Sequence, residues 1–218
     1  MTEDVKRTYD GSRRREQAAL TQQRVVSAAR ELFLAHGYAA TTMADVAAAA
    51  DVVVQTVYSS AGGKAALAKR VWDVTIAGDF EGVPLAARAQ AQAIRSERDP
   101  RRVLTLYAAL SRDVYQRLGP LARVLRAGAD RDEELRALID TTERERLAGT
   151  GALAGHLHAA GVLRPGLAAE RAGHRIWVLN GGEVADGLTL RCGWSLDEYE
   201  AWLAESMIAA VLPGPGGG

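Results

Sequence analysis

Residues 41–64, TTMADVAAAADVVVQTVYSSAGGK, contain the most specific pattern in this chain of 218 residues. Thr42 is a good helix N-cap, because its hydroxyl can accept a hydrogen bond from a backbone N–H two or three residues on. The alanine-rich run Met43–Ala50 favours a first short helix. Residues Val53–Ser60 predict a second one, with Val57 turned inward and polar side chains turned out. Two short helices joined by a tight turn are typical of a DNA-reading helix-turn-helix.

Upstream of this pair, residues from about Ala18 to His36 predict a longer helix. Its apolar stripe recurs at three- and four-residue spacing, and Gly37 is a fitting C-terminal stop. The stripe consists of Val25, Ala28, Ala29, Leu32 and Phe33. These residues are expected to form core, so that the first 70 residues contain a three-helix head.

The head resembles the N-terminal domain of TetR-type bacterial transcriptional regulators over roughly residues 20–70. The matching features are AARELFLAHGYAATTMADVAAAA (28–50), the T-x-Y of residues 56–58 and GGKAAL (62–67). Asp51 stands where the family usually has glycine, and Ala61 where it usually has an aromatic residue. Asp tolerates a positive φ, so the first change is compatible with the turn. The second predicts looser docking of the head on the rest of the chain.

The resemblance implies which side chains contact DNA. Two near the start of the second helix reach base edges, where Gln pairs with adenine and Thr touches a thymine methyl group. The others hold phosphates and set register, although Thr42 as a cap alone and Tyr58 as a packing residue alone remain alternatives. The base readers are Gln55 and Thr56, and the phosphate contacts are Thr42, Tyr58 and Lys64.

Composition sets the class of protein. The chain is 48% apolar, with 27 basic and 27 acidic residues, so it carries no global nucleic-acid charge signature. Through Trp72 ten Lys/Arg stand against seven Asp/Glu, and the remainder has 17 against 20. The single Cys192 excludes a disulfide framework and a cysteine zinc site. Without a signal peptide pattern or an 18-residue apolar run, we expect a soluble cytoplasmic protein that does not enter a membrane.

The rest of the chain predicts an all-α protein of about nine helices, a helix-turn-helix head joined to a helical-bundle body. Residues 1–19 are expected to be a basic flexible arm, either a solvated leader or a segment that lies along DNA. The head spans 20–70, the body 71–212, and a disordered tail 213–218. Within the body, Gly119-Pro120 is expected to end one helix, Gly149 and Gly151 to interrupt another, and residues 167–190 to form one helix.

The resemblance also implies a ligand pocket and a dimer in the body. The candidate pocket residues, chosen by position, are Tyr107, Leu110, Ser111, Thr142, Trp177, Asn180 and Glu183, with plain core as the alternative for Tyr107 and Trp177. Glycines in mid-helix suggest close approach of a partner helix, with a kink or a further pocket wall as the alternative. The candidate dimer contacts are Gly181, Gly182, Leu188, Tyr199 and Trp202.

No catalytic set is evident, and no cofactor or metal is expected. His156 and His158 diverge by about 200° on a helix and cannot share a metal from one face. The sequence therefore predicts a homodimeric DNA-binding regulator, most simply a repressor released from a palindromic operator by a small-molecule effector. The alternatives are a regulator without a ligand and a helical binding or assembly module that has lost DNA binding.

Overall fold

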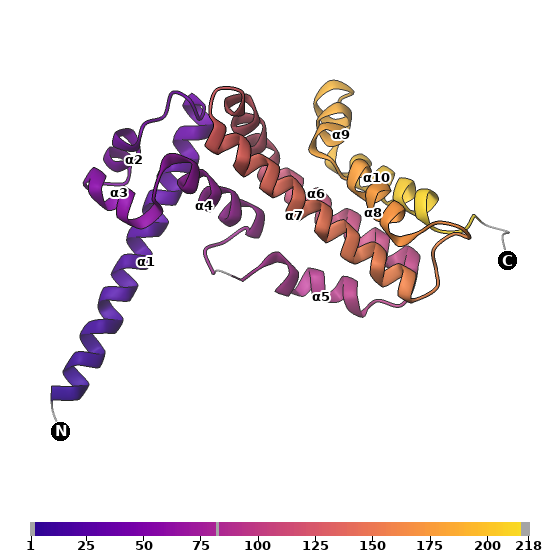
Figure 1. The fold of residues 1–218 in the computed structure, drawn as a ribbon, viewed down its shortest axis with the longest axis horizontal. Coiled ribbons are helices and arrows are strands. Elements are labelled where there is room, and N and C mark those ends of the chain that lie inside the picture. The colour runs from indigo at the N-terminus through magenta and orange to yellow at the C-terminus, as the bar shows by residue number, and fades with distance from the viewer. Residues whose placement is uncertain (1–2, 82, 215–218) are drawn as a thin grey trace. The chain divides into compact units, whose positions relative to one another are not determined.

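The computed structural model describes residues 3–81 and 83–214, and these residues form helices and loops without a strand (Figure 1). The all-α prediction is confirmed. The α-helices are α1 Glu3–His36, α2 Met43–Ala49, α3 Val54–Ala61, α4 Lys64–Ala77, α5 Ala89–Ser96, α6 Pro100–Ala129, α7 Glu133–Ala159, α8 Ala169–Leu179, α9 Gly182–Asp186 and α10 Leu196–Val211, with a 3₁₀ turn η1 at Leu85–Ala87 and a π turn η2 at Gly187–Arg191.

The chain divides into two compact units. Unit 1 contains the described residues up to Thr75 together with Pro120–Leu138, and unit 2 contains Ile76–Gly119 and the described residues from Ile139 onward. The sequence placed a boundary between residues 70 and 71, close to the end of unit 1 at Thr75. It did not predict that the end of α6 and the start of α7 join the unit that contains the helix pair.

The core of unit 1 follows the apolar stripe of α1. Val25, Ala28, Ala29 and Phe33 are buried as predicted, whereas Leu32 is half-buried, and the Phe33 ring lies 5.4 Å from the ring of Tyr38. The helix itself begins at Glu3, so the described part of the segment predicted as a flexible arm is helical. Residues 13–19, RRREQAA, consist of strong helix formers, which favours extension of α1 in this direction.

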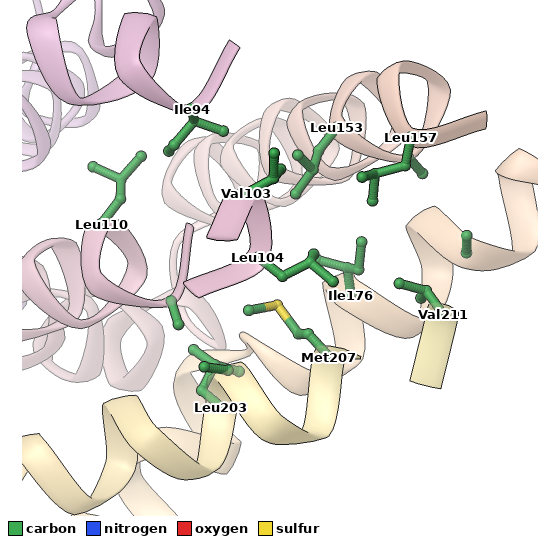
Figure 2. Packing of buried hydrophobic residues seen from close by; sticks show 14 of the residues in the cluster. Ile94, Val103, Leu104, Leu110, Leu153, Leu157, Ile176, Leu203, Met207 and Val211 are labelled. Atoms are coloured by element: carbon green, nitrogen blue, oxygen red, sulfur yellow. The ribbon is translucent and has the colours of Figure 1, made fainter. Parts of the chain in front are cut away.

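The core of unit 2 lies between α6, α7, α8 and α10. Figure 2 shows Leu104, Leu157, Ile176, Leu203 and Met207, one or two from each of these helices, converging on one another. All five are almost completely buried. Close packing of this kind stabilises each helix far more than its intrinsic propensity does.

The helix end predicted at Gly119-Pro120 is wrong. α6 passes through Gly119 and Pro120 without a break. Pro120 has no backbone N–H to donate to the carbonyl of Gln116, four residues earlier. Gln116 is exposed, so water can reach this part of the helix. Leu121 and Leu125, both fully buried, pack the helix on the far side of the proline. Burial of these side chains outweighs the local cost of the proline.

The glycines of the body also behave differently from the prediction. α7 runs unbroken through Gly149 and Gly151, whereas the helix predicted over 167–190 stops at Leu179. Gly181 has extended φ and ψ and lies between α8 and α9, so it is not a mid-helix glycine. A Cβ at this position would lie 3.1 Å from the carbonyl oxygen of Val178, which explains why the turn needs glycine.

Candidate nucleic-acid interface

The first helix of the pair, α2, is fixed at its start by a capping box. The Thr42 hydroxyl accepts a hydrogen bond from the Asp45 N–H at 3.1 Å, and the Asp45 carboxylate accepts from the Thr42 N–H at 2.8 Å and from its hydroxyl at 2.7 Å. The bond from the Thr42 hydroxyl lowers the pKa of Asp45, with the backbone N–H of Thr42 as the second cause. Thr42 is thus a cap that remains exposed, and its phosphate contact stays a prediction.

The turn between α2 and α3 is a Schellman motif built around Asp51. The Val52 N–H donates to the Ala47 carbonyl at 3.0 Å, and the Asp51 N–H donates to the Ala48 carbonyl at 3.2 Å. Asp51 has φ 52°, the only positive φ of a non-glycine among the described residues. The expectation that Asp51 adopts the conformation usually taken by glycine is confirmed.

The second helix, α3, has one buried face and one open face. Val57 and Ala61 are buried against the rest of unit 1. Gln55 is exposed, Thr56 is half-buried, and Tyr58 is 48% exposed. Of the side chains predicted to contact DNA, Gln55 and Tyr58 therefore lie on the open face of α3, with Thr56 at its edge.

Lys64, at the start of α4, has contacts that the sequence did not predict. Its ammonium donates to the Ala39 carbonyl at 3.3 Å and lies 4.2 Å from the centre of the Tyr38 ring. Burial lowers the pKa of Lys64, while the charge of Asp132 opposes this shift. Because an ammonium has three donors, these contacts still leave Lys64 able to bind a phosphate.

Tyr38 connects Lys64 to the turn before α7. The Tyr38 hydroxyl donates to one Asp132 carboxylate oxygen at 3.1 Å, and the other oxygen accepts from the Leu135 N–H at 2.9 Å. Burial, and then the charge of Asp132, raises the pKa of Tyr38. A Cβ added at Gly128 would lie 3.0 Å from Leu135 and 3.2 Å from Tyr38, so the α6–α7 turn packs closely on this ring.

In unit 2 the structure brings three of the predicted pocket residues together around Arg146. Asn180 donates to the Tyr107 hydroxyl at 3.2 Å, and Arg146 donates to Asn180 Oδ1 at 2.7 Å and to the Trp177 carbonyl at 2.6 Å. The Arg146 guanidinium lies 4.4 Å from the centre of the Trp177 ring and forms a 2.7 Å ion pair with Glu143. Burial raises the pKa of Tyr107.

The other four predicted pocket residues lie outside this cluster. Leu110 belongs to the apolar core, and Glu183 is exposed. Ser111 donates to the Tyr107 carbonyl at 2.8 Å, and the buried Thr142 donates to the Ile139 carbonyl at 2.8 Å, each within its own helix. Arg146 was missed, because one arginine within ERER offers no sign of which will reach another helix.

The predicted dimer contacts separate into surface and core. Tyr199 is 1% exposed, so it belongs to the core and lies beneath Trp202, with which it stacks at 6.5 Å. Trp202 is half-buried and meets the Trp194 ring edge-on at 6.4 Å. Leu188 is half-buried in η2, while Gly181 and Gly182 form the half-buried turn into α9. The sequence did not single out Val178 and Leu190, which are 56% and 59% exposed.

Neither a cluster of three or more His, Cys, Asp or Glu side chains able to hold a metal ion nor a helix long and apolar enough to cross a bilayer was found among the described residues.

Comparison with known proteins identifies the family of the head. Residues 25–71 match the model of the bacterial regulatory proteins of the tetR family. The resemblance predicted for roughly residues 20–70 is confirmed. A search of curated proteins gives no significant match.

Solved structures extend the similarity to the whole fold. NalD of Pseudomonas aeruginosa, the secondary repressor of the MexAB-OprM multidrug efflux pump, is 22% identical with TM-score 0.65, covering 89% of this chain and 98% of NalD. A Syntrophomonas wolfei protein described as a TetR-family regulator is 15% identical with TM-score 0.70, covering 87% and 94%. A transcriptional regulator from Saccharomonospora viridis, in complex with choline, is 16% identical with TM-score 0.65, covering 88% and 98%.

Proposed function

We propose that this chain, which matches the model of the tetR-family bacterial regulatory proteins at residues 25–71 and shares the fold of solved regulators, is a cytoplasmic repressor that binds a specific DNA sequence. The observation that carries the proposal is the open face of α3, where Gln55 and Tyr58 are exposed beside a fully buried Val57. A short helix held by a capped neighbour and a rigid turn presents these side chains in a fixed orientation, as base readout requires.

The side chains of this face have different roles. Gln55 and Thr56 read base edges, so Gln55→Ala relaxes the sequence preference. Tyr58 and Lys64 hold phosphates, and Thr42 adds a further contact from the start of α2. The double substitution Tyr58→Phe with Lys64→Ala therefore weakens binding to all sequences alike. Loss of the Lys64 phosphate contact also lowers the slope of log K against log salt by about one.

Two copies of the chain act together as a homodimer through the surface of α8, α9, η2 and α10. Exposed Val178 and Leu190 and the half-buried Leu188 and Trp202 give this surface its apolar character, and large exposed apolar side chains favour association. A two-fold dimer presents two copies of α3, so the operator is palindromic with half-sites spaced near whole helical turns.

A small molecule bound in unit 2 releases the repressor by population shift. Tyr107, Trp177 and Asn180 supply an aromatic wall and polar groups, and the choline complex of the Saccharomonospora viridis protein is a precedent for a ligand in a related fold. Binding favours a conformation of the dimer that no longer fits its half-site spacing. A coupling free energy of a few kcal/mol is sufficient, since about 1.4 kcal/mol changes affinity tenfold.

A regulator without a small-molecule effector is the second candidate function. It is favoured by the way Arg146 already bonds Asn180 and the Trp177 carbonyl, because side chains that satisfy one another need no ligand. A bound effector would have to displace or join this network. The substitution Arg146→Met tests the point: it changes effector response in the first candidate and only stability in the second.

The decisive experiment measures binding of the purified chain to duplexes from its own upstream DNA and from a random pool, at low and moderate salt. The expected result is enrichment of a palindromic motif, with a complex of two chains per duplex. Gln55→Ala should broaden the motif, and Tyr58→Phe with Lys64→Ala should weaken binding without changing it. A chain that remains a monomer and binds no duplex at any salt concentration refutes the proposal and leaves the assembly module as the explanation.

A further inference from the structure

The open face of α3 carries exposed apolar side chains as well as polar ones. Val53 is 69% exposed and Val54 is 39% exposed, directly before Gln55 and Thr56. The other large apolar side chains described as exposed in unit 1 are Leu20 and Tyr58, so three of the four lie within α3 and its N-cap. The buried face of α3 is supplied separately by Val57 and Ala61, so the two valines add nothing to this core.

Val53 is also an unfavourable residue for its position in the helix. It is the N-cap of α3 and forms no side-chain cap bond, whereas Thr42 and Ser195 cap α2 and α10 with complete capping boxes. Ser, Thr, Asn and Asp are strongly preferred at an N-cap over Val. A residue that breaks a local preference while exposing apolar surface indicates selection for something other than helix stability.

Building on the proposed function, we propose that Val53 and Val54 read thymine 5-methyl groups in each half-site. The edges of bases in the major groove consist of hydrogen-bond donors and acceptors, apart from the thymine methyl group and the much smaller C5–H of cytosine. An isopropyl side chain on a donor or acceptor would desolvate it without replacing the lost bond, but on a methyl group it buries apolar surface. The valines therefore select thymine and disfavour other bases, while Gln55 reads a neighbouring base by hydrogen bonds.

The size of the effect follows from the area of one methyl group. Burial of one methyl or methylene changes Kd by about fourfold. Replacing a contacted thymine by deoxyuridine deletes only the methyl group and leaves base pairing and backbone charge unchanged. Each contacted thymine should therefore show a roughly fourfold loss of affinity on this replacement.

The test uses the full chain and the duplex that it selects from a random pool. Each thymine is replaced in turn by deoxyuridine, and Kd is measured for the wild type and for Val53→Ala, Val54→Ala and Val53→Thr. Val83→Ala, a change at an exposed valine of unit 2, is the matched control. We expect the wild type and the control to lose affinity at one or two thymines per half-site. Each valine variant should lose part of this discrimination, because Ala and Thr each keep one methyl group.

Val53→Thr separates the effect of Val53 on thymine recognition from its effect on the stability of the fold. Thr is close to Val in shape and supplies the missing cap, so it should raise the unfolding midpoint while it lowers the penalty of the uracil replacement. Wild-type binding that is indifferent to uracil at every thymine would overturn the inference and leave the regulator assignment intact. A uracil penalty that all three valine variants retain undiminished would also overturn it, and loss of that penalty in Thr56→Ala would assign it to Thr56. Absence of any duplex binding by the wild type would instead overturn the proposed function and this inference with it.

Discussion

α7 and α8 approach each other through two glycines, and this contact offers a sharp prediction about stability. A Cβ built on Gly173 would lie 3.1 Å from the Cα of Gly151, 3.4 Å from its nitrogen and 3.5 Å from the Thr150 carbonyl oxygen. All three atoms belong to the backbone of α7, so no side-chain rotation can make room. Gly173→Ala should therefore push the two helices apart.

The expected magnitude is the balance of two opposing effects. Alanine in place of a helical glycine stabilises by about 1 kcal/mol through backbone entropy. Overpacking a close-packed contact costs about 1–3 kcal/mol, and contact with backbone favours the upper part of this range. Gly173→Ala should therefore lower the free energy of unfolding by about 1–2 kcal/mol. For a chain of this length this corresponds to a fall in Tm of about 2–8 °C.

Gly149→Ala is the matched control, because it makes the same change on α7 with no heavy atom within 4 Å of the new Cβ. Only the entropic effect applies, so this variant should gain about 1 kcal/mol. Both variants are measured by urea unfolding at one protein concentration, since the stability of a dimer depends on concentration. If Gly173→Ala were as stable as Gly149→Ala, the glycine contact would not explain the approach of α7 and α8.

Substitutions at three further positions test local features. Asp51→Gly should stabilise unit 1 by about 1 kcal/mol by relieving a positive φ, seen as a higher unfolding midpoint; an unchanged or lower midpoint would contradict the strain. Thr42→Ala should cost about 1 kcal/mol through loss of the cap, whereas Thr42→Ser should retain it, and equal losses in both would refute the cap. The Arg88 hydrogen bonds lower the pKa of Asp79 to about 2, so their contribution to stability is present above pH 4 and is lost as pH falls towards 2. Urea unfolding from pH 7 to 2 should show a smaller acid loss in Asp79→Asn; identical pH profiles would exclude the pair.

The head was predictable because its determinants are local. Thr42 and Asp45 are three residues apart, and the turn around Asp51 is closed by bonds within six residues. The apolar stripe of α1 lies on one helix and needs no partner to be recognised. Signals of this range can be read directly along the chain, and they define both the helix pair and the open face of α3.

The errors in the body come from long-range contacts. Pro120 should end a helix on local grounds, and it fails to do so because Leu121 and Leu125 are buried on the far side of it. Asn180 donates to Tyr107, which is 73 residues away in the chain, and it lies at the break between α8 and α9 that the sequence did not predict. Arg146 donates to Asn180, which is 34 residues away in the chain. Neither of these two residues indicates the other in the sequence, so the predicted pocket omitted Arg146.

Lys64 shows how local signals and long-range contacts combine at the candidate interface. Its place at the start of α4 is local and predictable, but its orientation depends on the Tyr38 ring, and the Tyr38 hydroxyl is held by Asp132, 94 residues along the chain. A lysine has a flexible stem and would otherwise lose rotamer entropy when it binds a phosphate. Because Tyr38 and the Ala39 carbonyl already restrict the ammonium, part of this entropy is lost on folding and not on binding DNA. We therefore expect the α6–α7 turn, which no pattern in the sequence connects with the head, to contribute to the proposed binding of phosphate by Lys64.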